Sequence, residues 1–406
     1  MSAPRIAIIG AGIGGFTLAL ALRQRGMAAE LFEQASELHE IGAAVALSAN
    51  ATRELERLGL LDAIAAHSTE PTELIWRDGH TGARVAAHRV RQDGSYRARF
   101  GAPYFGIHRA QLQHVFHAAH GAEGLHLGHH LASIAETGSA LRLEFTNGHV
   151  READLVIGAD GVRSAVRHWI SGRPGTVYSR TSAFRGIVPA ARLPSLPDPE
   201  AIQFWMGPDA HLLHYAIGPG AETVNFFAVV EGPAHWPDPQ HWIVPAAPGE
   251  AVSAFSGWHP SVTEMVGAGW VDKRWALFVV QPPLRWHRGR AVLIGDAAHA
   301  MLPHQGQGAN QTIEDAVSLA ALLAAKGTAD LPALFARYEA LRRARTRKIQ
   351  RSSWATNRAL HLSPGPAIAA RDARLARFAG DFGWIHAFDA LAAASQPAAP
   401  HGRAVS

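Results

Sequence analysis

Short apolar runs near the start of the chain alternate with glycines in an order that predicts parallel α/β structure. Residues 6–9 (IAII) predict a buried strand, an Ala/Leu-rich stretch over 16–25 predicts a helix that ends at Gly26, and residues 31–33 predict a second strand. A strand, a glycine turn, a helix and a strand within about 30 residues is the pattern of a Rossmann-type βαβ unit.

Later stretches extend this pattern. Residues 50–66 and 107–120 predict helices, and the continuous apolar run at 155–158 predicts a strand that is buried on both faces, as in a parallel sheet. Residues 291–294 repeat the parallel-strand pattern, and a further helix is expected from 309 to 326. The first and last parts of the chain therefore contribute to one α/β domain.

Residues 178–265 differ in character from the stretches on either side. Pro-rich turns separate short segments in which apolar and polar residues alternate, at 203–205, 211–217 and 223–230. Alternation with a period of two is typical of antiparallel strands that have one face buried. We therefore predict an antiparallel sheet that is inserted as a second domain between parts of the first.

The predicted fold class is α/β, with a Rossmann-like domain, an inserted antiparallel-sheet domain and a C-terminal helical segment. An Arg-rich helix is expected near 336–355, and the Ala/Pro-rich end of the chain is expected to be frayed. The Rossmann-like domain is assigned to residues 1–72, 97–177 and 266–335, the sheet domain to 73–96 and 178–265, and the C-terminal helices and tail to 336–406.

Composition narrows the class of protein. The 406 residues suit two domains, and 38 Lys and Arg against 34 Asp and Glu give a formal net charge of +4, which is too mild to imply nucleic-acid binding. The absence of cysteine excludes disulfides, iron–sulfur clusters and thiolate nucleophiles. No signal peptide is recognised, and the longest apolar helical run, 317–325, is too short to cross a membrane. We expect a cytoplasmic protein, either a monomer or a homodimer.

The glycine turn carries the first candidate chemistry. Gly10, Gly12 and Gly15 satisfy the GxGxxG pattern directly after a strand, and Glu33 ends the next strand. Such a turn lets a helix N-terminus approach a pyrophosphate, and the carboxylate can accept hydrogen bonds from a ribose diol. The motif leaves NAD and FAD both open, whereas Glu33 argues against NADP at this site. The candidate dinucleotide-binding residues are Gly10, Gly12, Ile13, Gly14, Gly15, Glu33 and Gln34.

Two further motifs favour FAD over NAD. Residues 153–167 (ADLVIGADGVRSAVR) deliver Asp160 from a buried strand into a turn, and residues 295–310 (GDAAHAMLPHQGQGAN) place Asp296 after another predicted strand. The two stretches resemble the DG and GD motifs of the group A flavoprotein monooxygenases, especially relatives of the salicylate and 6-hydroxynicotinate hydroxylases. The resemblance extends from residue 5 to about residue 355.

This resemblance implies a bound FAD. The aspartate of the GD motif binds the flavin ribityl chain in the family, which assigns that role to Asp296, and the DG motif with Asp160 is implicated in both FAD and NAD(P)H binding. The helix expected near Ala309 would direct its positive end at the flavin. Arg167 is expected to pair with Asp160 or to reach a phosphate, unless its role is structural. The other FAD contacts implied by the resemblance are Val45, Arg109, Leu131, Gly306, Gly308, Ala309 and Asn310.

The substrate is expected to bind at the antiparallel sheet. Alternation along the strand puts His211 and Tyr215 on one face and His214 on the other. In the hydroxynicotinate-type relatives a His and a Tyr four residues apart lie over the flavin, and these two residues match that spacing. His304 in the GD motif is a second candidate base, because imidazole accepts protons near neutral pH. The catalytic candidates are thus His211, Tyr215 and His304, and the substrate-binding candidates are Arg185, His214 and Gln305.

The resemblance implies a hydroxylase of phenolic or heteroaromatic acids. NADH or NADPH would reduce the flavin, which would then react with O2 to form a C4a-hydroperoxide that the ring attacks. Ala46 stands where hydroxynicotinate relatives have a histidine, which favours a salicylate-like or hydroxybenzoate-like substrate. Two alternatives stay open, namely a FAD-dependent dehydrogenase or reductase without oxygen insertion, and a flavin-binding redox sensor. No metal site is predicted, because the histidines between 117 and 130 lack a carboxylate cluster.

Overall fold

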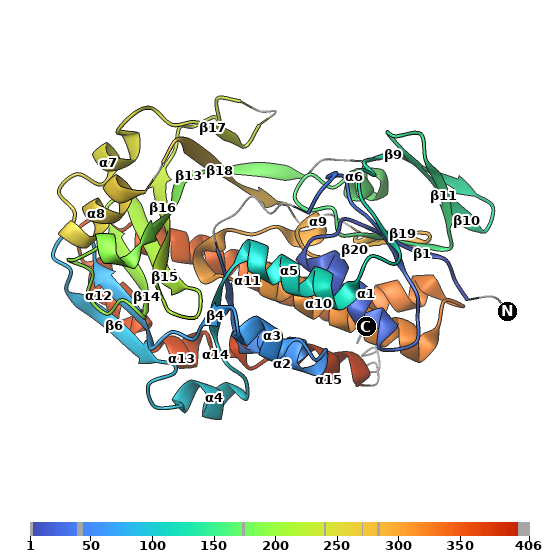
Figure 1. Ribbon diagram of the computed structural model, residues 1–406, viewed down its shortest axis with the longest axis horizontal. Helices are drawn as coiled ribbons and strands as arrows, with labels where there is room; N and C mark the ends of the chain where they lie inside the picture. Colours follow the sequence, from blue (N-terminus) through green and yellow to red (C-terminus); the bar gives the residue numbers. More distant parts are fainter. Residues whose placement is uncertain are drawn as a thin grey trace, which may run out of the picture.

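The computed structural model describes residues 3–38, 44–172, 175–238, 241–269, 271–281 and 285–396. Two large sheets organise the molecule, a six-stranded sheet in one half and an eight-stranded sheet in the other (Figure 1). Helices α1, α5 and α10 pack beside the six-stranded sheet, and the long helix α11 connects the two halves. The predicted α/β fold class, with a separate antiparallel sheet, is confirmed.

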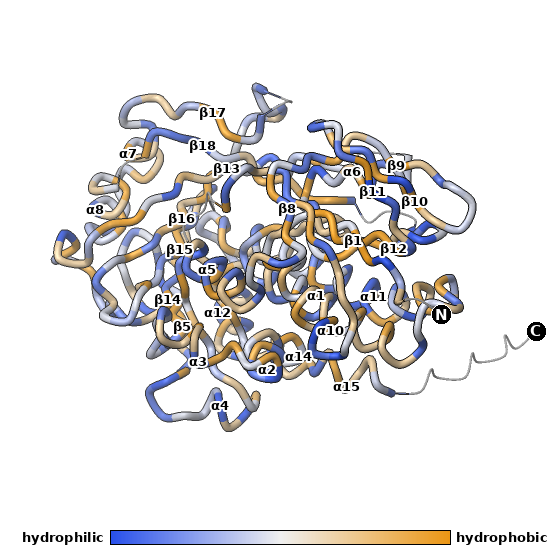
Figure 2. The backbone as a smooth tube through the Cα atoms, turned by 45° about the vertical axis from the view of Figure 1, so that its right-hand side comes forward, coloured by the Kyte–Doolittle hydropathy of each residue, from blue (hydrophilic) through white to orange (hydrophobic). Residues whose placement is uncertain are grey.

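The six-stranded sheet is the Rossmann-like core. Its order is β19-β20-β12-β1-β2-β8, and all neighbours are parallel except the edge strand β19. All four residues of β1 and of β12 are buried, as expected for strands with helices on both faces, and Figure 2 shows β1 as a hydrophobic segment. The strands are β1 (Ile6–Ile9), β2 (Glu30–Phe32), β8 (Leu125–His126), β12 (Leu155–Gly158), β19 (His287–Arg288) and β20 (Ala291–Leu293).

Helices and a small sheet surround this core. Helix α1 makes extensive contacts with both α10 and α5, and the two short helices α6 and α9 follow the ends of β12 and β20. The bounds are α1 (Ile13–Arg23), α5 (Arg109–His120), α6 (Ala165–Ser171), α9 (Asp296–His299) and α10 (Gly308–Lys326). An antiparallel sheet of β9 (Leu131–Thr137), β10 (Ala140–Phe145) and β11 (Val150–Ala153) precedes β12.

The eight-stranded sheet has the order β17-β18-β13-β16-β15-β14-β5-β6 and is antiparallel except between β14 and β5. Its strands are β5 (Glu73–Asp78), β6 (Arg84–Arg89), β13 (Thr176–Pro189), β14 (Ile202–Gly207), β15 (Ala210–Ile217), β16 (Thr223–Glu231), β17 (Ile243–Pro245) and β18 (Lys273–Val280). Strand β18 pairs with β13, although the sequence placed residues 266–335 in the Rossmann-like domain. Helices α7 (Glu250–Ala254) and α8 (Pro260–Ala268) contact each other, and α8 packs on β13.

Two predicted helices begin or break differently from expectation. The stretch 50–66 forms two helices, α2 (Ala49–Arg57) and α3 (Leu61–Ala65), because Gly59 at a φ of +74° ends the first one. The stretch 107–120 becomes helical only at Arg109, since β7 (Phe105–His108) pairs with β3 (Ala44–Leu47) and β4 (Ser68–Thr69). Helix α4 (Ser95–Phe100) lies between β6 and β7 in the chain.

The C-terminal part is more ordered than the sequence suggested. Helix α11 (Leu331–Leu360) starts where the Asp330 side chain accepts a hydrogen bond from the amide of Ala333. The Ala-rich stretch after it, expected to be frayed, forms α12 (Ala367–Leu375), α13 (Phe378–Asp381), α14 (Gly383–His386) and α15 (Ala390–Ser395). Apolar side chains such as Leu375 and Ile385 anchor these helices, while residues 397–406 lie outside the described part of the chain.

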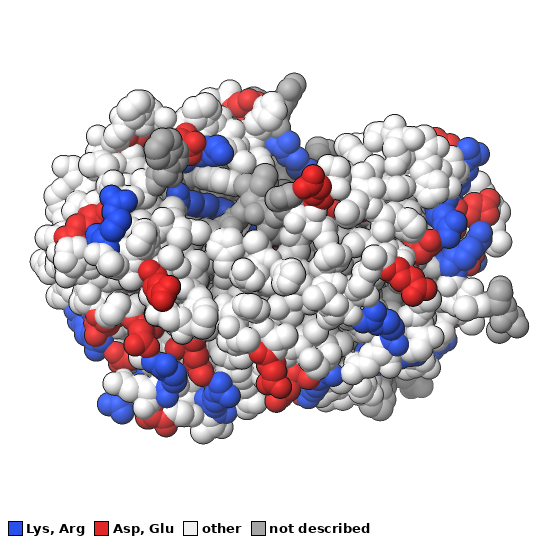
Figure 3. Space-filling model, viewed as in Figure 1, with Lys and Arg blue, Asp and Glu red and all other residues white. Residues whose placement is uncertain are grey.

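Charged side chains of both signs are interspersed on the face shown in Figure 3. The small excess of basic residues is therefore not gathered into one stripe on that face. Among the described helices, none is both long enough and apolar enough to cross a bilayer.

A buried ionic network joins α10, α11 and the turn after β20. Asp315 accepts hydrogen bonds from the amide of Gly295 at 2.8 Å, from His299 Nε2 at 2.5 Å and from Arg342 Nε at 2.7 Å. Glu314 accepts from Arg342 and from Arg345. Burial alone would raise the pKa of both carboxyls. The adjacent cations lower it by more, so the pKa of each carboxyl lies below its ordinary value.

We expect Arg342→Met to destabilise the fold by about 3–5 kcal/mol near neutral pH, because it removes a cation that both buried carboxylates contact. Urea unfolding measures this, with Arg347→Met on the exposed side of the same helix as the control. The depressed pKa values mean that the wild-type network stabilises above about pH 4 and that this contribution is lost as the pH falls through the folded-state values. In Arg342→Met each carboxyl has one cation fewer beside it and protonates more readily, so the stability deficit should shrink towards pH 4. A deficit that is equal at pH 4 and pH 8 would contradict this account.

Candidate functional site

The glycine turn between β1 and α1 leaves open space at the N-terminus of the helix. A Cβ on Gly10, whose φ is +104°, would lie 2.5 Å from the carbonyl oxygen of Ala159, and one on Gly15 would lie 1.9 Å from that of Gly10. A Cβ on Gly12 would meet nothing within 4 Å. The packing of the turn thus requires glycine at positions 10 and 15. Gly12 instead borders open space at the N-terminus of α1, which suits a pyrophosphate.

Glu33 lies beside this turn, at the end of β2. Its carboxylate accepts hydrogen bonds from the amides of Ala11 at 2.9 Å and Ala35 at 3.0 Å, which fix its position next to the glycine turn. Each carboxylate oxygen can accept a further hydrogen bond, as a ribose diol requires. Gln34 is exposed directly after it.

The DG motif is held rigidly at the end of β12. Asp160 accepts hydrogen bonds from Ser164 Oγ at 2.5 Å and from the amide of Val166 at 3.1 Å, and burial raises the pKa of its carboxyl. Arg167 is buried and donates to the carbonyl oxygens of Val162 at 2.6 Å and Ala297 at 2.9 Å. Arg167 therefore ties the DG motif to the GD motif, which is the structural reading that the sequence had left open.

The GD motif forms a loop whose shape is set by a buried asparagine. The Asn310 side chain donates to the carbonyl oxygens of Ala46 at 2.9 Å and Gly306 at 2.6 Å, and it accepts from the amide of Ser48 at 2.8 Å. Asp296 at the start of α9 is exposed, and a Cβ on Gly308 would lie 3.9 Å from its Oδ1. The N-terminus of α10 therefore opens beside a free carboxylate, an arrangement that suits the ribityl and pyrimidine parts of a flavin.

Three other predicted cofactor contacts lie on β3, β9 and α5. Val45 lies on β3 next to Ala46, Leu131 is buried at the start of β9, and Arg109 begins α5. Burial lowers the pKa of Arg185 to about 10, and the nearby charge of Arg109 adds to this effect. The guanidinium groups of Arg109 and Arg185 thus lie close enough for their charges to interact.

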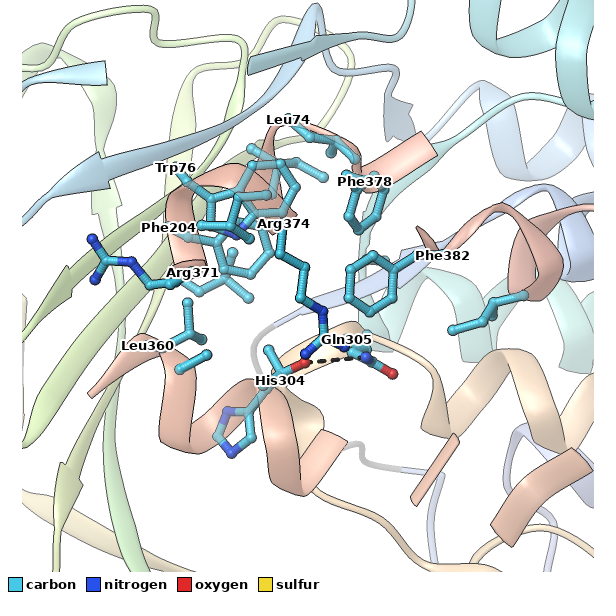
Figure 4. A pocket seen from close by; sticks show the side chains of 18 of the residues that line it. Leu74, Trp76, Phe204, His304, Gln305, Leu360, Arg371, Arg374, Phe378 and Phe382 are labelled. Carbon is cyan, nitrogen blue, oxygen red and sulfur yellow. Dashed lines mark hydrogen bonds between the residues drawn. The ribbon is translucent and has the colours of Figure 1, made fainter. Parts of the chain in front are cut away.

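A cavity of about 360 Å³ lies between the eight-stranded sheet, the GD loop and the C-terminal helices (Figure 4). Trp76 and Phe204 are stacked in its wall with ring centroids 5.1 Å apart, and Phe378 packs against Trp76 at 5.0 Å. Ala46 and Gly306 reach the same cavity from the side of the GD loop. The cavity is therefore mostly apolar and borders the region that suits a flavin, as a site for an aromatic ring requires.

A few polar groups converge on this apolar cavity. His304 Nε2 and Gln305 Oε1 are buried and have no hydrogen-bond partner among the described residues. Gln305 Nε2 donates to Ser352 at 2.6 Å and Thr356 at 3.1 Å, which leaves its carbonyl oxygen free. Tyr104 and Tyr215 also line the cavity, and burial raises the pKa of both phenols. A ligand can thus find both an acceptor nitrogen and an acceptor oxygen here.

Three arginines from the C-terminal helices also line the cavity. The Arg371 side chain donates to Asp372 at 2.8 Å, whereas among the described residues the side chains of Arg358 and Arg374 form no ion pair or hydrogen bond. The Arg374 side chain extends from α12 into the cavity, and its guanidinium carbon lies 5.3 Å from the ring centroid of Phe382 (Figure 4). Arg374 can therefore receive an anionic substituent without first breaking an ion pair.

The structure separates the predicted substrate residues into two groups. Tyr215, His304 and Gln305 line the cavity, and His211 contacts His304, with 3.3 Å between His211 Nε2 and His304 Nδ1. His214 lies on the opposite face of β15 beside Trp205 and is absent from the cavity lining. Arg185 is absent from it too, since its guanidinium is stacked over Trp275 and Phe227. His214 and Arg185 therefore do not line this cavity.

Several functional candidates were missed by the sequence analysis. Tyr104, Arg374 and the aromatic side chains of β5, β14 and α13 approach the cavity from segments as far apart in the sequence as β5 and α13, and no local motif marks them. His361, at the end of α11, lies in the stretch that resembles the family weakly. Among the described residues, no cluster of His, Asp or Glu could hold a metal ion.

Comparison with known proteins agrees with this geometry. The FAD binding domain family matches residues 4–353. The chain is 39% identical to 3-amino-4-hydroxybenzoate 2-monooxygenase PtmB3 of Streptomyces platensis, over 97% of this chain and 98% of that protein. It is 34% identical to 6-hydroxynicotinate 3-monooxygenase of Bordetella bronchiseptica, over 86% and 90%.

A solved structure described as a salicylate hydroxylase substrate complex superposes with a TM-score of 0.83 at 29% identity, covering 98% of this chain and 100% of that one. Fold, glycine turn, DG and GD motifs and cavity thus occur together in one chain, as they do in flavin-dependent hydroxylases of aromatic rings. The chain belongs to the FAD binding domain family and is one of its aromatic-ring monooxygenases, using FAD and NAD(P)H.

Proposed function

We propose that this enzyme hydroxylates a phenol that also carries a carboxylate, such as an amino- or hydroxybenzoate. The observation that carries the proposal is an apolar cavity lined by two polar groups. Among the described residues, His304 Nε2 has no hydrogen-bond partner and the Arg374 guanidinium has no ion pair. The name of the 3-amino-4-hydroxybenzoate 2-monooxygenase relative supports this substrate class. We further infer that the enzyme acts in the cytoplasm, where NAD(P)H is supplied.

His304 is suited to accept the phenol proton. Its Nε2 is buried and unpartnered at the cavity, while its Nδ1 is engaged by His211 at 3.3 Å. Burial lowers the pKa of His304 to about 3, so the ring is neutral and can accept a hydrogen bond at physiological pH. A hydrogen bond from the phenol would increase the electron density of the ring that is hydroxylated.

Arg374 and Gln305 would orient the rest of the ring. A carboxylate can form a charge-assisted hydrogen bond with the Arg374 guanidinium, which the Phe382 ring supports from one side. The free Oε1 of Gln305 can accept from an amino or hydroxyl substituent. The stacked Trp76 and Phe204 pair offers a flat apolar surface for the aromatic ring.

The residues that would hold FAD are those around the glycine turn and the two aspartate motifs. Gly12 and the N-terminus of α1 would bind the pyrophosphate, Glu33 a ribose and Asp296 the ribityl chain, while the 306–310 backbone would face the flavin ring. FAD supplies the transfer of electrons from NAD(P)H and the activation of O2. The protein excludes water from the cavity and positions the ring beside the cofactor.

The alternatives raised by the sequence are less consistent with the cavity. A dehydrogenase or reductase without oxygen insertion has no use for a phenol-deprotonating group, and a redox sensor has no use for a built substrate cavity beside the flavin loop. Coupling of NAD(P)H consumption to ring hydroxylation distinguishes all three.

The first prediction concerns turnover. With FAD bound, 3-amino-4-hydroxybenzoate or salicylate should accelerate NADH or NADPH oxidation, and mass analysis should find one atom from isotopically labelled O2 in the product. Benzoate, which lacks the phenol, serves as the control and should yield no hydroxylated product. Failure of a panel of phenolic acids to stimulate oxidation would contradict the proposed substrate class.

The second prediction concerns the carboxylate. Arg374→Gln should weaken binding of a phenolic acid by about 10- to 100-fold, since a hydrogen bond to a charged group contributes about 1.5–3 kcal/mol. Binding of the matched phenol without a carboxylate, for example 2-aminophenol against 3-amino-4-hydroxybenzoate, should change little. Arg377→Gln, at an exposed arginine of the same region that is absent from the cavity lining, is the control. Equal losses for both ligands would rule out Arg374 as the anchor.

The third prediction concerns the cofactor. Gly12→Ala should fold normally, because its Cβ meets no protein atom within 4 Å, yet it should bind FAD at least about tenfold more weakly because the methyl group enters the pyrophosphate space. Flavin retained after dialysis and FAD titration measure this, and thermal unfolding of the FAD-free protein tests the fold. Gly267→Ala in α8, which also meets no atom within 4 Å, is the matched control. Wild-type FAD affinity in Gly12→Ala would place the pyrophosphate elsewhere.

A further inference from the structure

A continuous hydrogen-bonded chain of three histidines leads from the cavity to the protein surface. His304 Nδ1 lies 3.3 Å from His211 Nε2, His211 Nδ1 lies 2.7 Å from His361 Nε2, and His361 Nδ1 lies 2.7 Å from Glu231 Oε1. The four residues come from the GD loop, β15, the C-terminus of α11 and the end of β16. Residues up to 150 positions apart in the sequence are thus hydrogen-bonded in one continuous row.

The atoms in this chain follow one direction. Each imidazole presents Nε2 towards the cavity and Nδ1 towards the surface. If each neutral ring carries its proton on Nδ1, every contact has one donor and one acceptor, and the last N–H donates to the Glu231 carboxylate. His304 Nε2 is then left as an acceptor, and it has no hydrogen-bond partner in the part of the chain that the structure describes.

Burial distinguishes the two ends of the chain. His211, His304 and His361 are 1%, 3% and 7% exposed, whereas the Glu231 side chain is 47% exposed. Burial lowers the pKa of all three histidines, with the neighbouring histidines adding to this effect for His211 and His304. A proton is therefore costly to hold on any of the rings, and the exposed carboxylate is the group that can accept it and exchange it with water.

We propose that His304, His211, His361 and Glu231 form a relay that carries the phenol proton of the bound substrate out to solvent. The O–H bond of the phenol breaks as an N–H bond forms at His304 Nε2. The Nδ1 protons of His304, His211 and His361 each move one step outward, and Glu231 takes the last proton and releases it to water. One proton leaves, the substrate becomes a phenolate, and no oxidant or reductant is needed.

His211, His361 and Glu231 act through His304 and need not touch the substrate. His361 is held at the end of α11, where its carbonyl oxygen accepts a hydrogen bond from the amide of Asp209 at 3.3 Å. The proposal rests on the proposed function in one respect, namely that the ligand is a phenol. The direction of the hydrogen bonds does not depend on the ligand and can be tested without one.

The first experiment reads the tautomers in the FAD-loaded protein without substrate. Nitrogen NMR of isotope-labelled histidine, assigned with single His→Gln variants, should find His304, His211 and His361 neutral near pH 7 and protonated on Nδ1. Conversion of His361 to Gln should leave the other two rings neutral. A His211 or His361 ring protonated on Nε2 would break the direction of the chain and overturn the relay, whatever the substrate is.

The second experiment follows the proton itself. Oxidised, FAD-loaded enzyme is mixed rapidly with 4-hydroxy-3-nitrobenzoate at a pH below the phenol pKa of the free ligand, so that the ligand enters the cavity as the neutral phenol. The absorbance of its phenolate then reports deprotonation in the cavity without turnover. His361→Gln should slow phenolate formation at least about tenfold while leaving the ligand dissociation constant within about twofold, because a Gln can hold the hydrogen bonds but cannot pass a proton. Glu231→Gln should slow it less, since water can replace an exposed acceptor.

Controls separate transfer of a proton from support of the fold. Glu222→Gln, at the exposed start of the same hairpin strand, and His241→Gln, at an exposed histidine, should match wild type. Added imidazole should restore the rate in His361→Gly, which a purely structural role would not allow. Wild-type rates in His361→Gln would overturn the relay, whereas failure of the wild-type enzyme to bind any phenolic acid would instead overturn the proposed function.

Discussion

The buried ionic contacts of Asp315 fix the geometry on which the rest of the site depends. One carboxylate binds the amide of Gly295, the imidazole of His299 and the guanidinium of Arg342, and thereby joins the turn after β20, the helix α10 and the helix α11. Asp296 directly follows Gly295, and α10 begins at Gly308. The position of the free carboxylate and of the helix N-terminus beside the flavin region is therefore set by a charge pair that water does not reach.

The same network brings the C-terminal helices to the cavity. Since Arg342 and Arg345 fasten the first half of α11 to Glu314, its second half is directed at the eight-stranded sheet. Gln305 then binds Ser352 and Thr356 on α11, and His361 at its end binds His211 on β15. The cavity is thus closed by helices that belong to neither large sheet, and its specificity can change with α12 to α14 while the cofactor motifs stay the same.

The sequence sufficed for the parts of the molecule whose physics is local. The glycine turn at Gly10 to Gly15 needs its residue types for backbone reasons that any βαβ unit shares, and the runs at 6–9 and 155–158 are apolar because both faces are buried. Alternation also placed Tyr215 on the cavity side and His214 on the other. The same alternation does not say what a face packs against, so it could not reveal that His211 lies against His304.

The parts that could not be predicted depend on contacts between distant segments. His361 and Glu231 are 130 residues apart, and neither lies in a motif. Arg374 lies on a helix of nine residues in an Ala-rich stretch, where composition alone suggested a frayed end. Such residues become functional only when the chain has folded, because their roles come from burial and from the partners that burial leaves them.

The apolar cavity and the histidine chain are physically linked. An aromatic-lined cavity suits oxygen chemistry when the bound ring displaces water from it, but the solvent that would take up a phenol proton is then displaced as well. The buried imidazoles cannot store that proton, since their environment disfavours the charged form. An Arg374 cation on one side compensates the charge of a substrate carboxylate, whereas the phenol proton has to leave the cavity if a phenolate is to form. A hydrogen-bonded path to water serves this chemistry, and the exposed Glu231 carboxylate lies at the end of the path from His304.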